Sequence, residues 1–298
     1  MSLGFAAIAW VPPTPPTFIV AGDSRISLGE GHKSDAGIKT YELGGRTAAV
    51  AVGSALPAIH AAETVRTIVE NHNRRTPERR LGFYDTTRLF AFFLKRAANS
   101  QGAACEIAIA GFLNSQVPVL ALVQATPERN RVVFQSVEQG AKTALSIGVH
   151  EGSRVLTQGL AFLQREGKPI MAPGLSLLWY IAHHPGAFNS IGGGLSVGTC
   201  TADADSVSWP IIEIAGRRFL RGFDVTDSYR PNWPPPVGIE YDDEWCESCD
   251  RRIDANDGVI EPVGVEVSGY EIDLLSTADT LFQTHDDPKR FVRGAAEF

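Results

Sequence analysis

The chain has 298 residues, of which 44% are hydrophobic and 20% are charged, a composition typical of a globular protein with one large domain or two smaller ones. Its formal net charge of −7 argues against a nucleic-acid-binding surface. No apolar run is long enough to cross a membrane, and no basic region precedes the apolar stretch 3–11, so we expect a cytoplasmic location. Four cysteines in a chain of this size do not indicate a disulfide framework.

The first part of the chain alternates short apolar runs with turns. The apolar runs have the length and the branched side chains of buried strands. The first two runs are joined by the proline-rich loop 11–17, and the fourth run ends at Gly53. Four strands are predicted here: 3–10, 18–22, 38–43 and 47–52.

Helices and strands then follow in blocks. Apolar residues recur with helical spacing over 55–70 and 85–98, and Asp85 is the expected N-cap of the second helix. The later predicted elements are strands 105–112, 117–124, 131–136 and 143–148, helices 151–165 and 175–182, and strands 192–201 and 207–214, the last two pairing across the turn 203–205. This order is typical of two antiparallel sheets packed face to face, with helix pairs on their outer faces.

Three residues that could carry chemistry fall at the ends or edges of the early strands. Asp23 begins an Asp-Ser-Arg triplet, Lys39 comes sixteen residues later, and Gly53 fourteen residues after that. Rigid scaffolds often place functional residues at such positions. Taken singly, each has an ordinary alternative: Asp23 caps a turn, Lys39 is a charge at a strand edge, and Gly53 precedes a helix.

With these spacings and in this strand context, the stretch resembles the proteasome β-subunit family of N-terminal-nucleophile (Ntn) hydrolases. The resemblance is clear over residues 2–60 and looser to about residue 222. It implies an α+β fold, the four-layer αββα Ntn-hydrolase sandwich, over residues 1–222. Residues 223–298 would then form a C-terminal extension that acts as a strap or an assembly element.

The resemblance also implies a mechanism, because the nucleophile of this family is the first residue of the mature chain. Here that residue is Ser2, once Met1 is removed, and its α-amine has an ordinary pKa of about 8, near enough to neutrality to accept the hydroxyl proton. Lys39, held by Asp23, would lower the pKa of the amine, and the Gly53 N–H would stabilise the oxyanion. The implied activity is hydrolysis of a peptide or amide bond in a homo-oligomer, without a cofactor or a metal.

The chain departs from the family pattern at three positions. Active subunits have a serine directly after the glycine that corresponds to Gly148, and this chain has Val149. Active subunits also have an aspartate followed three residues later by a serine, and this chain has Asn189 and Gly192. Asparagine forms hydrogen bonds but carries no charge, so Asn189 is a candidate site residue with a weaker supporting role.

Two alternatives to a peptidase stay open. A proteasome-like subunit that assembles without catalysis would account for Val149, Asn189 and Gly192. The retained Asp23 and Lys39 favour catalysis, since a scaffold has no evident need for a lysine at that spacing. A small-molecule amidase or acylase of the same superfamily is the weaker alternative.

The predicted C-terminal extension contains one Cys-x-x-Cys pair, Cys246 and Cys249. Such a pair is half of a structural zinc site, but no second pair follows, and His285 is the only later histidine. We therefore expect two free or surface thiols rather than a metal or redox site. The proline-rich stretch 227–236 is predicted to be a linker or strap, and 259–274 a small hairpin.

Overall fold

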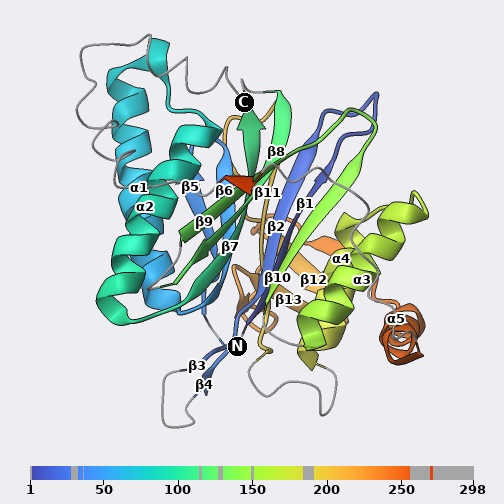
Figure 1. Ribbon diagram of the computed structural model, residues 1–298. Coiled ribbons are helices and arrows are strands. Elements are labelled where there is room, and N and C mark those ends of the chain that lie inside the picture. Colours follow the sequence, from blue (N-terminus) through green and yellow to red (C-terminus); the bar gives the residue numbers. More distant parts are fainter. Residues whose placement is uncertain are drawn as a thin grey trace.

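The fold is mixed α and β, with two large sheets that pack face to face between helices (Figure 1). This computed structural model describes residues 2–27, 33–35, 37–113, 116–126, 130–148, 151–183, 191–255 and 269–270. Within these ranges the chain forms four sheets and five α-helices. No helix in them is long and apolar enough to span a bilayer.

The first large sheet is antiparallel, with the strand order β10-β1-β2-β11. Its two central strands are apolar on both faces, because both faces are covered. Leu3 and Phe5 face one core, whereas Ala6 and Ile8, at the alternate positions, face another. The strands are β1 (Leu3–Ala9), β2 (Thr17–Asp23), β10 (Lys142–Gly148) and β11 (Leu195–Thr201).

The second large sheet is also antiparallel, with the strand order β16-β9-β8-β7-β6-β5. Its outer face packs against helices α1 (Ala55–Arg75) and α2 (Phe83–Gln101). The predicted N-cap of α2 is wrong: the cap is Gly82, and Asp85 lies in the first turn, where its Oδ2 accepts the Gly82 N–H at 3.4 Å. The strands are β5 (Thr40–Gly44), β6 (Thr47–Gly53), β7 (Cys105–Leu113), β8 (Val117–Ala125), β9 (Asn130–Ser136) and β16 (Gly269–Tyr270).

The inner faces of the two large sheets pack against each other through an apolar core. Side chains from β1 and β2, such as Ile8 and Phe18, meet Val50 and Leu120 of the second sheet in this core. The sheets approach closely at Gly4, where an added Cβ would lie 2.6 Å from a methyl group of Val50. This close approach is the physical reason for a glycine inside β1.

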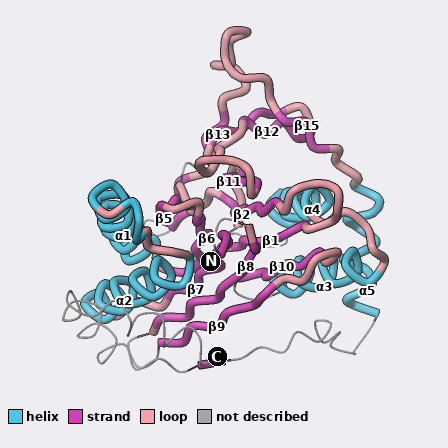
Figure 2. The backbone as a smooth tube through the Cα atoms, turned by 90° about the horizontal axis from the view of Figure 1, so that it is seen from above, coloured by secondary structure: helices cyan, strands magenta, loops and turns pink. Residues whose placement is uncertain are grey.

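Helices α3 (Glu151–Arg165) and α4 (Met171–His183) pack on the other face of the first sheet, and α5 (Asp243–Ala255) packs against these two helices. Figure 2 shows them on the side of the sheets opposite α1 and α2. Cys246 and Cys249 of α5 form no disulfide, but they are 0% and 5% exposed in this core, so they are buried thiols and not surface thiols. No group of three or more possible metal ligands occurs among the described residues.

Two small sheets were not predicted. One joins β3 (Ile26–Ser27) to β4 (Lys33–Ser34). The other has the order β14-β13-β12-β15. The predicted pairing of 207–214 with the strand before it is therefore wrong for most of its length. It is present only as the bridge between Thr199 and Ser208. The strands of this sheet are β12 (Ile211–Ile214), β13 (Arg217–Leu220), β14 (Phe223–Asp224) and β15 (Val237–Ile239), which runs parallel to β12.

Candidate functional site

A buried ion pair joins the two large sheets at one end. Asp23 is the last residue of β2, and Lys39 stands directly before β5. The Lys39 Nζ lies 2.8 Å from Asp23 Oδ1, and the two side chains are 3% and 0% exposed. The backbone of Lys39 also pairs with β6, since its carbonyl accepts the Ala51 N–H at 2.9 Å. The pair is therefore fixed to both sheets.

Asp23 has two further hydrogen-bond donors. The Leu3 N–H donates to Oδ1 at 2.8 Å, and the Gly192 N–H donates to Oδ2 at 3.2 Å. Asp23 thus connects Lys39 to the residue that follows Ser2 and to the loop before β11. A buried carboxylate needs this number of partners to offset its lost hydration.

Burial shifts the pKa of both members of the pair. Burial lowers the pKa of Lys39, and the neighbouring Asp23 carboxylate opposes that shift. Burial likewise raises the pKa of Asp23, against the charge of Lys39 and the two backbone donors. Each shift favours the neutral form, so the pair holds its proton less firmly on Lys39 than an exposed lysine would. Such a shift is common where a side chain takes part in proton transfer.

The rest of the Asp-Ser-Arg triplet holds the loop 191–194 against this ion pair. The backbone N–H groups of Ser24 and Arg25 both donate to the Gly192 carbonyl, at 3.2 and 2.9 Å. The Ser24 hydroxyl accepts the Gly194 N–H at 2.7 Å, and an Arg25 guanidinium N–H donates to the Ile191 carbonyl at 3.1 Å. No sequence pattern predicts this role, because the loop lies more than 160 residues away along the chain.

A pocket opens beside the ion pair and contains three of the predicted site residues. Ser2, which is 4% exposed and directly precedes β1, lines it together with Lys39 and Gly53. The other lining residues are Ile26, Tyr41, Ala51, Val52, Ser54 and Ala55. The fold thus brings together Ser2, Lys39 and Gly53, with Asp23 bonded to Lys39 behind them. Asn189 and Val149 lie outside the described residues.

Two lining residues were not singled out from the sequence. The Tyr41 hydroxyl donates to the Ile38 carbonyl at 2.9 Å, and burial raises the pKa of this phenol above its ordinary value. Tyr41 is therefore a neutral wall of the pocket. Ser54 is a second hydroxyl-bearing residue there, and its backbone N–H donates to the Ala104 carbonyl at 3.1 Å. No composition or spacing signal separates Ser54 from an ordinary helix N-cap.

The conformation of Gly53 requires glycine. Its φ is +97°, and an added Cβ would lie 2.4 Å from the Ala104 carbonyl oxygen. We expect Gly53→Ala to lower the free energy of unfolding by about 1–2 kcal/mol from the left-handed backbone alone, and by more through the clash. Urea denaturation measures the loss.

Gly102→Ala is the matched control for this prediction. Gly102 also has a positive φ, +59°, but no atom lies within 4 Å of its added Cβ. Equal losses in the two variants would show that the contact between Gly53 and Ala104 has no energetic importance.

No protein-family model matches the chain, and no curated protein matches it at a significant level. The functional interpretation therefore depends on the pocket itself. The pocket is lined by the Ser2 hydroxyl, by Lys39 of the buried pair with Asp23, and by Gly53, which has a positive φ at the end of β6.

Proposed function

We propose that this chain is an Ntn amidohydrolase of the proteasome-like type, which cleaves peptide or amide bonds with Ser2 as nucleophile after removal of Met1. The observation that carries the proposal is the shared pocket of Ser2, Lys39 and Gly53. The hydrogen bonds of Asp23 to Lys39 and to the Leu3 N–H support it further, because they link the Lys39 ammonium to the start of β1, directly after Ser2.

The arrangement of the elements supports the same proposal. The two large sheets pack face to face, α1 and α2 cover one outer face, and α3 and α4 cover the other. This is the layering expected for the four-layer αββα sandwich. The cytoplasmic location and the homo-oligomer expected from the sequence belong to the proposal, and cell fractionation and light scattering test them.

In the proposed reaction, the free α-amine of Ser2 accepts the proton of its own hydroxyl as Oγ attacks the substrate carbonyl. The positive charge of Lys39 keeps the amine neutral by raising the cost of a second charge nearby. The N–H of Gly53 donates to the oxyanion that forms. The tetrahedral intermediate then releases the amine product, which takes the proton from the α-ammonium, and water hydrolyses the ester on Ser2.

The first test is the intact mass of the full chain before and after incubation with a β-lactone, which acylates nucleophilic hydroxyls. We expect loss of Met1 and one adduct, located on Ser2 by peptide mapping. Three of the four cysteines are poor competitors, because burial raises the pKa of Cys105 and Cys200 to about 11 and that of Cys246 to about 12. Thiols with such pKa values stay protonated at neutral pH.

The other outcomes point elsewhere. Retention of Met1 would block the α-amine and contradict the proposal. Removal of Met1 without an adduct would favour the inactive, structural subunit, for which Val149, Asn189 and Gly192 are the relevant departures. An adduct formed only by small acyl donors, with no cleavage of peptides, would favour the small-molecule amidase or acylase.

A further inference from the structure

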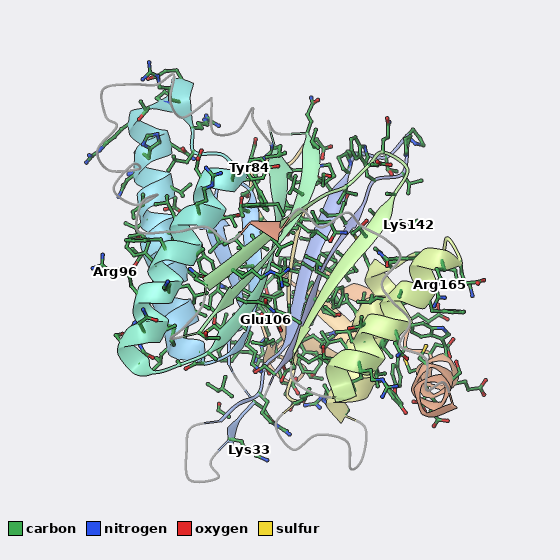
Figure 3. The ribbon with its side chains drawn as sticks, in the orientation of Figure 1. Lys33, Tyr84, Arg96, Glu106, Lys142 and Arg165 are labelled. Atoms are coloured by element: carbon green, nitrogen blue, oxygen red, sulfur yellow. The ribbon has the colours of Figure 1, made fainter. Side chains whose placement is uncertain are left out.

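Glu106 carries a carboxyl group into the layer between the two large sheets. It lies on β7, and the next residues on the same face of that strand, Ala108 and Ala110, belong to the core between the sheets. Glu106 itself is half-buried. Figure 3 shows it in the middle of the molecule, between the strands. A carboxyl group at such a place needs hydrogen-bond donors, and it has two.

The two donors come from different sheets. Gln124 of β8, directly opposite Glu106 in the strand pairing, donates its Nε2–H to Oε1 at 2.8 Å. The backbone N–H of Gly148, the last residue of β10, donates to Oε2 at 3.2 Å. Glu106 is therefore fixed on its own sheet by Gln124 and connects that sheet to the other through Gly148.

This connection lies next to the pocket on both sides. On β7, Glu106 follows Cys105, the residue that pairs with Gly53. Gly148 pairs with Leu3, and an added Cβ on Gly148 would lie 2.9 Å from the carbonyl oxygen of Ser2. The backbones of Gly148 and Ser2 are thus in contact. Gly53 therefore pairs with the residue before Glu106, and the hydrogen bond of Glu106 reaches Gly148, which contacts Ser2.

We propose that Glu106 is a positioning residue for Ser2: its hydrogen bond to the Gly148 N–H holds β10, and with it the start of β1, in register with Gly53. The inference rests on the proposed function. Glu106 acts through the backbone of Gly148 and touches no substrate. It complements Asp23, which ties the start of β1 to Lys39 from the other side.

In this proposal Glu106 positions Ser2 through its hydrogen-bond acceptor and not through its charge. In Glu106→Gln the side-chain carbonyl still accepts the Gly148 N–H, and the new amide group donates to Gln124 once the Gln124 amide turns over. In Glu106→Leu the acceptor is gone and the Gly148 N–H loses its partner. Because a displacement of about 1 Å costs about 100-fold in rate, we expect that loss in Glu106→Leu and less than about threefold in Glu106→Gln.

The test compares acylation of Ser2 by the β-lactone, followed by intact mass, in the wild type and the two variants. Glu138→Leu is the control for the Glu-to-Leu change, since Glu138 is exposed beyond the end of β9. Equal rates in the wild type and Glu106→Leu would overturn the inference. Equally slow acylation in Glu106→Gln and Glu106→Leu would also overturn it, because charge would then be the cause.

Amide hydrogen exchange at Gly148, measured by NMR, separates this inference from the proposed function. We expect slow exchange in the wild type and Glu106→Gln, and exchange at least about tenfold faster in Glu106→Leu, since exchange follows local opening. If the wild type is not acylated at all, the proposed function fails. The exchange rates then still show whether Glu106 holds the Gly148 N–H. If Glu106→Leu does not fold, Glu106→Ala replaces it, since it also removes the acceptor of the Gly148 N–H: acylation as fast as in the wild type would contradict the inference, and slower acylation would support it.

Discussion

Ser2→Ala is expected to abolish the β-lactone adduct and to lower the hydrolysis of peptide amides by a factor on the order of 10⁴ or more. The physical reason is that the substitution deletes the oxygen atom that forms the acyl bond. The side chain of alanine still fits at this buried position, because it is that of serine without the Oγ atom. Intact mass measures the adduct, and initial rates with fluorogenic peptide amides measure hydrolysis.

Two further variants make this result specific. Ser2→Thr keeps a hydroxyl at the same position, so we expect it to retain the adduct on residue 2. Ser54 is the other serine that lines the pocket, and Ser54→Ala should leave the adduct on Ser2. An adduct that survives Ser2→Ala and disappears in Ser54→Ala would identify Ser54 as the nucleophile and contradict the proposed mechanism.

Lys39→Met is expected to impair both the reaction and the fold. Methionine keeps a similar length without the charge that keeps the Ser2 α-amine neutral, so the acylation rate should fall by about 10²–10⁴-fold, the range for impaired general-base catalysis. The fold is affected because Asp23 is 0% exposed and would lose its cation. We expect the free energy of unfolding to fall by about 3–5 kcal/mol, measured by urea denaturation.

The double variant Asp23→Asn/Lys39→Met separates the two effects. It removes both charges and keeps an amide oxygen that can accept the Leu3 N–H. We expect it to be more stable than Lys39→Met alone, since no unpaired charge remains buried, and to be acylated no faster. Losses that simply add would show that the two side chains do not interact energetically.

The local pattern of apolar residues is sufficient to predict most of the secondary structure. The runs 3–10 and 18–22 were predicted as strands from their apolar, branched composition, and β1 and β2 occupy them. The helical spacing over 55–70 likewise predicted α1. The exact caps were less predictable, because Asp85 has the chemistry of an N-cap and yet lies in the first turn, where it accepts the Gly82 N–H instead.

Strand pairing was harder to predict than the strands themselves. The turn at 203–205 suggested that 207–214 pairs with the preceding strand. In the fold, β12 pairs with β13 and, in parallel, with β15. Parallel strands are joined by a long connection, so neither a turn motif nor the spacing of apolar residues predicts that they pair. The burial of Cys246 was missed for a similar reason: α5 reaches its core through contacts with helices far away in sequence.

The sequence by itself determined most strands of the two large sheets, helices α1 to α4 and the spacing of Asp23, Lys39 and Gly53, because strand periodicity, helical spacing and glycine turns are local properties of the chain. Only the tertiary structure decided that these residues share a pocket with Ser2, that the lysine–aspartate pair is buried, and that the loop 191–194 and Glu106 hold the surroundings in place. Burial and hydrogen bonding between distant segments depend on how the sheets pack. No local pattern encodes that packing.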